Sequence, residues 1–282
     1  MSTVAVALAA ARAKLPASEA RLLLGHVLGQ SAAWLVTHNG EALDEDALLG
    51  FASLVARRAG GEPVAYLVGH REFFGRRFAV SPAVLIPRPE TELLVELALA
   101  RVGADSTATI LDLGTGSGCI AITLALERSA AWLTAVDASS AALQVAAANA
   151  RGLGAKLRLL QGDWYTGVAG ERFDLIVGNP PYVADGDSHL AQGDLRHEPR
   201  QALASGVDGL DALRAIVGGA VPHLLPGGSL LLEHGYDQAA AVRELMERAG
   251  FSDVRVYPDL AGVQRVTTGN LPRINGVPAD RL

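Results

Sequence analysis

Apolar residues over the first part of the chain recur at three- and four-residue spacing. Residues 4–11 form an apolar stretch of this kind, and a later one contains Leu48, Leu49, Ala52 and Val55. Such spacing predicts amphipathic helices. Ser18 is a candidate N-cap for a second helix, and the acidic run at residues 44–46 suits the positive end of another. We therefore predict an all-helical domain over residues 1–59.

The helical pattern ends at a stretch rich in glycine and β-forming residues. Gly60, Gly61 and Pro63 break the spacing, and Gly75 lies between aromatic and branched residues at Phe73, Phe74, Phe78 and Val80. Aromatic and branched residues on both sides of a glycine are typical of a β-hairpin. We expect a hairpin linker over residues 60–84 and a second domain over residues 85–282.

From residue 85 onward, short apolar runs alternate with helical stretches. Seven runs have strand character, at residues 108–113, 132–136, 157–160, 173–177, 229–233, 254–257 and 263–267. Helical stretches at residues 119–128, 140–151, 208–217 and 238–249 predict a doubly wound, mostly parallel α/β sheet. Only about five residues separate the last two strands, too few for a crossover helix, so these strands should pair antiparallel. A parallel sheet that ends in an antiparallel hairpin is typical of class I methyltransferases.

Composition narrows the class of protein further. The 282 residues are 50% hydrophobic, which is enough for one large and one smaller domain. The 30 acidic residues exceed the 24 basic ones, whereas nucleic-acid-binding proteins usually have a basic excess. Cys119 is the only cysteine, which excludes an intrachain disulfide. No run approaches the roughly 20 apolar residues that cross a bilayer. We therefore expect a cytoplasmic protein that does not bind membranes. The acidic excess leads us to expect no direct binding of nucleic acids.

A glycine-rich loop follows the first strand of the predicted sheet, with the order Gly114, Thr115, Gly116, Ser117 and Gly118. Glycines there let the backbone turn tightly and approach a ligand. Nicotinamide and flavin enzymes share such loops, so the loop alone does not identify the ligand. Asp112 discriminates, because a carboxylate there would lie near the ammonium group of a methionine moiety and would repel a pyrophosphate. We therefore predict that Asp112 and residues 114–118 bind S-adenosylmethionine.

Three more candidate cofactor residues follow the next two strands. Asp137 ends the second strand, where its carboxylate can accept hydrogen bonds from both ribose hydroxyls. Asp163 and Trp164 follow the third strand, where methyltransferases hold the adenine with a carboxylate near its amino group and a flat apolar ring beside it. Each has a structural alternative, since Asp137 can cap a helix and Trp164 can be a core residue.

The tetrapeptide Asn179-Pro180-Pro181-Tyr182 follows the fourth strand, where it can also serve as an ordinary turn. An amide or aromatic amine nitrogen is a poor nucleophile because its lone pair is delocalised. The Asn179 side-chain oxygen and the Pro180 carbonyl can accept its two N–H groups, with bonds that strengthen in the transition state. The prolines fix the backbone, and Tyr182 can stack on the planar group. The tetrapeptide thus predicts methyl transfer to a planar nitrogen, without a metal or a covalent nucleophile.

Adenine amino groups and glutamine amides both suit this tetrapeptide. The acidic composition and the small front domain supply neither the basic cleft nor the target-recognition region of a DNA adenine methyltransferase. Further motifs occur at residues 62–66, 71–75, 85–92, 198–199, 202–203 and 206–210, of which the Pro-Arg-Pro-Glu-Thr-Glu run at 87–92 is quite specific. With the tetrapeptide, they resemble the PrmC/HemK family of release factor glutamine methyltransferases over residues 18–268.

The resemblance implies a helical N-terminal domain, a β-hairpin linker and a class I methyltransferase domain. It implies methylation of the glutamine amide in the Gly-Gly-Gln motif of class 1 peptide chain release factors. It places residues 114–118, Asp137, Trp164 and Asn179 at the cofactor and its surroundings, and residues 179–182 at the glutamine. This sequence departs from the family pattern at Gly178, where the family often has serine. Its tail after Gly269 is also longer than the resemblance implies, and we expect this tail to be loose.

Three alternatives stay open beside this interpretation. They are an adenine amino-group methyltransferase acting on DNA or RNA, a non-catalytic binding protein with the same fold, and a dinucleotide-dependent oxidoreductase. A glutamine side chain is too small to identify one protein target, so specificity must come from contacts away from the reacting nitrogen. We therefore hypothesise that the helical domain over residues 1–59 docks the protein substrate.

Overall fold

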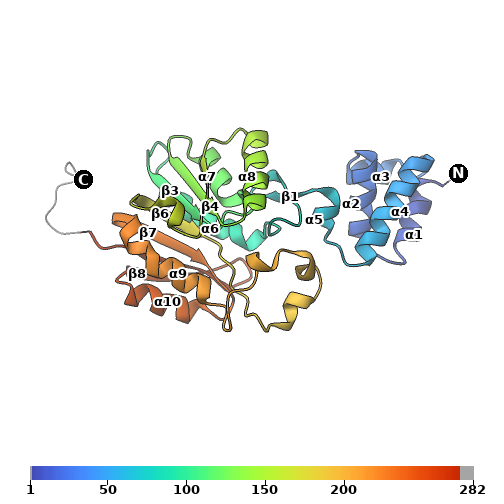
Figure 1. Cartoon of the computed structure of the whole chain (residues 1–282). Helices are drawn as coiled ribbons and strands as arrows, with labels where there is room; N and C mark the ends of the chain where they lie inside the picture. The colour runs from blue at the N-terminus through green and yellow to red at the C-terminus, as the bar shows by residue number, and fades with distance from the viewer. Residues whose placement is uncertain (1, 274–282) are drawn as a thin grey trace. The chain divides into compact units, whose positions relative to one another are not determined.

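Figure 1 shows the computed structural model of the chain, which describes residues 2–273. The chain divides into two compact units. One comprises Met1–His70 and Ala191–His197, and the other comprises Arg71–Leu190 and Glu198–Leu282. The first unit extends through His70 rather than ending at residue 59. Most of the tail that we expect to be loose lies outside the described residues.

The first unit contains five helices within its described residues 2–70. They are α1 (Val4–Ala11), α2 (Ala17–Leu28), α3 (Ala32–Thr37), α4 (Glu45–Ala59) and α5 (Val64–Val68). Their apolar side chains share one core, in which Leu23, Leu24 and Leu35 are fully buried. Leu67 and Val68 of α5 belong to the same core, which is why this unit continues past α4.

The starts of these helices follow the sequence prediction only in part. Asp44 is the N-cap of α4, and its carboxylate accepts a hydrogen bond from Ala47 N at 2.7 Å. Ser18 as an N-cap is wrong, because α2 begins at Ala17 with Pro16 before it and has no side-chain cap. Proline is tolerated at a helix start because the first turn leaves its N–H groups unpaired in any case.

Not every residue of the apolar pattern in α4 is buried. Leu49 is 63% exposed. Instead, a four-residue spacing places the core side of the helix at Ala47, Phe51 and Val55. The apolar pattern predicted a helix here. Because several apolar residues follow one another, the pattern did not show which side of the helix packs on the core.

A seven-stranded sheet forms the centre of the second unit. Its strands are β3 (Thr109–Leu113), β4 (Trp132–Asp137), β5 (Arg158–Gln161), β6 (Phe173–Gly178), β7 (Leu224–Glu233), β8 (Ser252–Pro258) and β9 (Gln264–Asn270). They lie in the order β5-β4-β3-β6-β7-β9-β8. The pairs among β3 to β7 are parallel, and β9 pairs antiparallel with both β7 and β8. The predicted class I methyltransferase sheet is thereby confirmed.

Helices cover both faces of this sheet (Figure 1). They are α6 (Glu92–Leu99), α7 (Cys119–Glu127), α8 (Ser140–Leu153), α9 (Asp211–Ala220) and α10 (Ala239–Arg248). Short 3-10 turns are η1 (Pro89–Thr91), η2 (Thr166–Val168), η3 (Ser188–Ala191), η4 (Leu195–His197), η5 (Arg200–Ala202) and η6 (Val221–His223). Within residues 2–273, no helix is long and apolar enough to span a membrane.

Strand alternation separates the core of this unit into two layers. Along β3, Ile110 packs with α6 and α7, whereas Leu111 and Leu113 pack with α9 and α10. Successive side chains of a strand point to opposite faces, so one short strand contributes to both layers. Because the parallel strands are covered on both sides, their sequences are almost continuously apolar.

A two-stranded hairpin, β1 (His70–Phe73) and β2 (Arg76–Ala79), precedes the sheet. Phe73 and Phe78 are buried in the layer with α6 and α7, with their rings edge to face and centroids 6.1 Å apart. Asn149 of α8 fixes the second strand, since it accepts a hydrogen bond from Ala79 N at 2.7 Å and donates to Ala79 O at 3.0 Å. The same amide donates to Ser117 O at 2.8 Å, which ties the hairpin to the glycine loop.

Candidate active site

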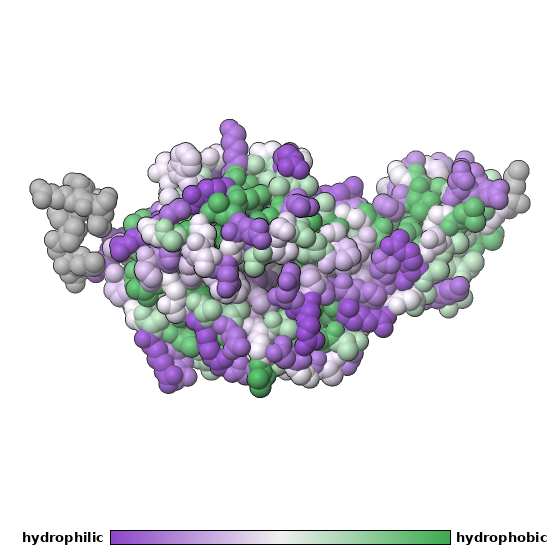
Figure 2. All heavy atoms as spheres, viewed as in Figure 1, coloured by the Kyte–Doolittle hydropathy of each residue, from purple (hydrophilic) through white to green (hydrophobic). Residues whose placement is uncertain are grey.

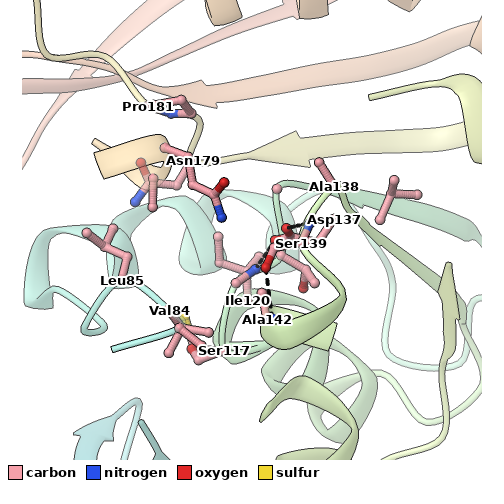
Figure 3. A pocket seen from close by; sticks show the side chains of 18 of the residues that line it. Val84, Leu85, Ser117, Ile120, Asp137, Ala138, Ser139, Ala142, Asn179 and Pro181 are labelled. Carbon is pink, nitrogen blue, oxygen red and sulfur yellow. Dashed lines mark hydrogen bonds between the residues drawn. The ribbon is translucent and has the colours of Figure 1, made fainter. Parts of the chain in front are cut away.

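A pocket of about 260 Å³ opens at the carboxyl ends of the central strands (Figure 3). Small molecules bind at this edge of open α/β sheets, in sites of a few hundred cubic ångströms. Most of the predicted site residues line its wall, namely Gly114, Thr115, Gly116, Ser117, Asp137, Asp163, Trp164, Asn179 and Pro181. The remaining predicted residues are not part of the wall, namely Asp112, Gly118, Pro180 and Tyr182.

The glycine loop turns sharply between β3 and α7. Gly116 has a φ of +56°, and a Cβ atom there would meet nothing closer than 4.0 Å, so the backbone is open to the pocket. Gly118 has a φ of +82°, and its Cβ would lie only 2.7 Å from the Ile122 side chain and 3.2 Å from that of Ala146. Gly118 is therefore required for close packing of the loop on α7 and α8 rather than for the pocket wall.

Asp137 braces the loop from the end of β4. Its Oδ2 accepts a hydrogen bond from Gly116 N and its Oδ1 accepts one from Ser139 N, both at 2.8 Å. The N-cap of α8 is Ser139, whose hydroxyl accepts from Ala142 N at 3.2 Å. Asp137 is thus not the helix cap. Each carboxylate oxygen has a second lone-pair site, which leaves Asp137 able to accept hydrogen bonds from a ligand.

Asp112 differs from its expected place beside the ligand. Its side chain is fully buried behind the loop, where Oδ2 accepts a hydrogen bond from the Thr115 hydroxyl at 2.6 Å. Its Oδ1 has no partner among the described residues. Burial raises the pKa of Asp112 to about 7. Asp112 therefore contacts the loop through Thr115 and is not among the residues that line the pocket.

Trp164 lies at the pocket in a rare backbone conformation. Its φ is +46°, in the left-handed region that few residues other than glycine adopt. Its ring edge comes within 3.6 Å of the position that a Cβ on Gly114 would occupy, and the side chain also packs against the core layer of α9 and α10. The Trp164 ring therefore contacts both the pocket and the core, which are the two environments that the sequence left open. Asp163, beside it, also lines the pocket, and its N–H donates to the Thr166 hydroxyl at 2.9 Å.

Asn179 lines the pocket and has a buried acceptor without a partner. Its Nδ2 donates to the Thr91 hydroxyl oxygen at 3.1 Å, while its Oδ1 is buried and has no partner among the described residues. Figure 3 shows Asn179 and Pro181 on the wall that faces Asp137 and Ser139. Buried acceptors are nearly always hydrogen-bonded, so an orphan oxygen at a pocket marks a place for a ligand donor.

The structure places Tyr182 away from the pocket wall. The ring packs against the core layer of α9 and α10, and its burial raises the pKa of the phenol, which stays protonated. Stacking of Tyr182 on a planar substrate is therefore not a feature of this arrangement. Pro181 is the member of the tetrapeptide that lines the pocket beside Asn179.

Sequence reasoning missed several residues of the site. Arg88 and Thr91 line the pocket, although the run at residues 85–92 served only as a family motif. Arg88 forms an ion pair with the fully buried carboxylate of Glu198, which also accepts a hydrogen bond from Ile86 N at 3.0 Å. The motifs at residues 85–92 and 198–199 contain more charged and hydroxyl residues than a helix start requires. That excess was the signal in the sequence that could have indicated a site.

A second hollow, of about 910 Å³, lies at the opposite edge of the sheet. Thr109 and Trp132 line it at the amino ends of β3 and β4. It contains neither the glycine loop nor the tetrapeptide, and ligands of open α/β sheets bind at the carboxyl edge. The smaller pocket is therefore the candidate active site.

Comparison with known proteins agrees with this geometry. A family model described as the PrmC N-terminal domain matches residues 2–69, and one described as the methyltransferase small domain matches residues 89–209. The release factor glutamine methyltransferase of Bordetella pertussis is 53% identical over 258 residues, which cover 91% of this chain and 96% of that protein. That of Salmonella typhimurium is 46% identical over 255 residues, which cover 90% and 92%.

Solved structures share the fold at lower identity. A methyltransferase from Pyrococcus furiosus superposes with a TM-score of 0.55 at 20% identity, covering 79% of this chain and 100% of that one. The hMettl16 catalytic domain superposes with a TM-score of 0.56 at 17% identity, covering 80% and 84%. These likenesses support the methyltransferase fold only. The sequence relatives go further because they match nearly end to end, and the chain belongs to the family of release factor glutamine methyltransferases.

Proposed function

We infer that this protein transfers the methyl group of S-adenosylmethionine to the side-chain amide nitrogen of a glutamine in a peptide chain release factor. Close relatives carry that activity in their names and match over nine-tenths of the chain. The observation that carries the chemistry is the buried, unpaired Oδ1 of Asn179 at the pocket. An N–H group of the acceptor amide would satisfy this oxygen.

The pocket residues fit S-adenosylmethionine. The open backbone at Gly116 allows close approach of a ligand, and Asp137 retains lone pairs for the ribose hydroxyls. Trp164 supplies an apolar ring for the adenine, with the Asp163 carboxylate near its amino group. When bound, S-adenosylmethionine supplies an electrophilic methyl group on a positively charged sulfur.

Asn179 and its neighbours would align the amide nitrogen and strengthen its nucleophilicity. In our proposal Asn179 Oδ1 accepts one N–H and the Pro180 carbonyl accepts the other. Methyl transfer would form the N–C bond as the C–S bond breaks, with the bonding electrons left on sulfur, and Asn179 and Pro180 would hold the amide nitrogen while it becomes more positive. Both hydrogen bonds therefore strengthen in the transition state, and the nitrogen then releases one proton to solvent. Alignment of nitrogen, methyl and sulfur supplies much of the remaining acceleration.

Transfer of label from tritiated S-adenosylmethionine tests this function. Purified class 1 release factor should become labelled, and mass spectrometry should place the methyl group on the glutamine of its Gly-Gly-Gln motif. A release factor with that glutamine replaced by alanine should stay unlabelled, as should DNA and RNA oligonucleotides. Label on the alanine variant, or on nucleic acid alone, would overturn the proposal.

The helical unit has a separate proposed role. None of its described residues lines the pocket, and a glutamine side chain alone cannot distinguish one protein from another. We propose that this unit docks the release factor, so that binding energy gained far from the reaction aligns the target glutamine.

A further inference from the structure

Glu233 is a buried acid that the mechanism above does not use. It ends β7, directly after Leu232, which pairs with Gly178 of β6. This register places it beside the start of the Asn179–Tyr182 tetrapeptide. The residue is only 1% exposed, and its Oε2 has no partner among the described residues. A buried carboxyl group costs free energy unless it is hydrogen-bonded, so its retention here calls for a reason.

Thr91 lies between Glu233 and Asn179. It is 2% exposed, and its hydroxyl oxygen accepts the hydrogen bond from Asn179 Nδ2. The Thr91 and Tyr182 hydroxyls both lower the pKa of the Glu233 carboxyl group, as hydroxyl groups near a carboxyl group do. A threonine hydroxyl has one hydrogen to donate and can accept as well. If the Thr91 hydroxyl donates its hydrogen to Glu233, its oxygen can only accept a further hydrogen bond. The part of the Asn179 amide that can donate one is its NH₂ group.

We propose that Glu233 and Thr91 are positioning residues, which form a polar relay that holds Asn179 with its oxygen toward the acceptor nitrogen. This inference rests on the proposed function. If the Asn179 amide were rotated by half a turn, its NH₂ group would face the N–H groups of the substrate, and donor would meet donor. The relay removes this unproductive orientation. It also gives a chemical reason for a threonine inside the motif at residues 85–92.

The alternative is that Glu233 and Thr91 merely support the fold. Thr91 packs at the start of α6, and its loss could loosen the whole pocket. A structural role would lower stability and cofactor affinity together with turnover. A positioning role would lower kcat while KM for the release factor and the Kd for S-adenosylmethionine stay nearly constant, because Asn179 acts on the reacting nitrogen.

Thr91→Val, Thr91→Ser and Glu233→Gln in the full-length enzyme separate the two roles. We expect Thr91→Val to lower kcat at least tenfold, with Kd and Tm close to those of the wild type. Thr91→Ser, which keeps the hydroxyl, should stay within about threefold of wild-type kcat. Thr123→Val is the matched control, because Thr123 is equally buried in α7, its hydroxyl has no partner among the described residues, and it is not on the pocket wall. It should leave kcat unchanged.

The double variant Thr91→Val with Glu233→Gln tests whether the two residues act as one relay. Residues of one hydrogen-bonded network show non-additive effects. The double variant should therefore lose no more kcat than the more impaired single variant. Multiplicative losses, wild-type kcat in Thr91→Val, or a parallel loss of Kd and Tm would each overturn the relay. Absence of methylation by the wild-type enzyme would instead overturn the proposed function, so the two failures are distinguishable.

Discussion

Single side chains at the pocket have separable tasks, and Asn179 is the one assigned to the acceptor nitrogen. Its oxygen is buried without a partner among the described residues, and its nitrogen is already bonded to Thr91. Asn179→Ala should lower kcat by on the order of 10²–10³-fold, as for the loss of one preorganised group that stabilises a transition state. Isothermal titration calorimetry should show S-adenosylmethionine affinity within a few-fold of the wild type. Wild-type turnover in this variant would contradict the assignment.

Asp137 is the residue assigned to the cofactor. Asp137→Ala should weaken S-adenosylmethionine binding by about 1.5–3 kcal/mol, because charge-assisted hydrogen bonds to the ribose are lost. The loop also loses the bond from Gly116 N, which adds to the effect. Asp174→Ala is a suitable control, since Asp174 likewise accepts backbone and hydroxyl hydrogen bonds, from Thr109, but lies at the start of β6. Equal affinity of the Asp137 variant and this control would mean that Asp137 makes no contribution to cofactor binding.

Glu233 should make stability depend on pH. Burial, with a smaller effect of Glu90, raises its pKa from 4.5 to about 7, although Thr91, Tyr182 and Arg265 act in the opposite direction. The folded protein keeps this proton after the unfolded chain has lost it. The group therefore favours folding below pH 4.5, and this contribution is lost as the pH rises through 7.

Glu233→Gln removes that titration. Relative to the wild type, the variant should gain about 2 kcal/mol in free energy of unfolding between pH 5 and pH 8, as measured by urea denaturation. Asp112 has a pKa of about 7 in both proteins, so its contribution cancels in the comparison. A difference between wild type and variant that does not change with pH would show that Glu233 titrates normally.

The sequence predicted most residues of the pocket wall but not the direction of every side chain. Asp112 was expected at the ligand because it precedes the loop by two positions. It shares a sheet face with Ile110, and alternation along β3 turns its side chain into the interior. Tyr182 was expected on the substrate, yet its half-buried ring packs against the core layer of α9 and α10. Such orientations depend on tertiary packing, which adjacency in sequence does not encode.

At the scale of elements, the strands and helices of the sheet were predictable because each is a long, strongly patterned segment. Strand order was less accessible, since the placement of β9 between β7 and β8 depends on pairing between distant residues. The contact of the hairpin with α8 was not predicted either. It depends on Asn149, a buried polar residue in an otherwise apolar helix face, whose partners Ala79 and Ser117 lie far away in sequence.

Asn149 should therefore couple the hairpin to the cofactor loop. Asn149→Leu removes three hydrogen bonds and leaves the N–H and C=O groups of Ala79 unpaired, which should lower the free energy of unfolding by about 2–4 kcal/mol. S-adenosylmethionine affinity should fall as well, because Ser117 O loses its donor. Asn149→Asp keeps the bond from Ala79 N and should have a smaller effect on stability. Denaturation and calorimetry on both variants check this, and unchanged cofactor affinity in Asn149→Leu would separate the hairpin from the loop.

For the whole molecule, the question is how a glutamine in one protein is selected. The helical unit exposes apolar side chains on its surface (Figure 2), among them Val6, Leu22, Val36 and Leu49. Deleting residues 1–59 is a harsh test, because it would strip Leu67 and Val68 of the core that they share with the other helices. Substituting exposed residues leaves that core intact.

Leu22→Ser with Leu49→Ser should separate docking from folding. The two side chains are 48% and 63% exposed on α2 and α4, so their replacement should change stability by less than about 0.5 kcal/mol. If the helical unit docks the release factor, kcat/KM for the full-length factor should fall at least tenfold. A short Gly-Gly-Gln peptide lacks the rest of the factor that would contact that surface, and its kcat/KM should stay the same. Trp132→Ser, at an apolar residue of β4 that is 72% exposed, should affect neither substrate. Equal losses on protein and peptide, or no loss on either, would mean that these helix faces take no part in docking.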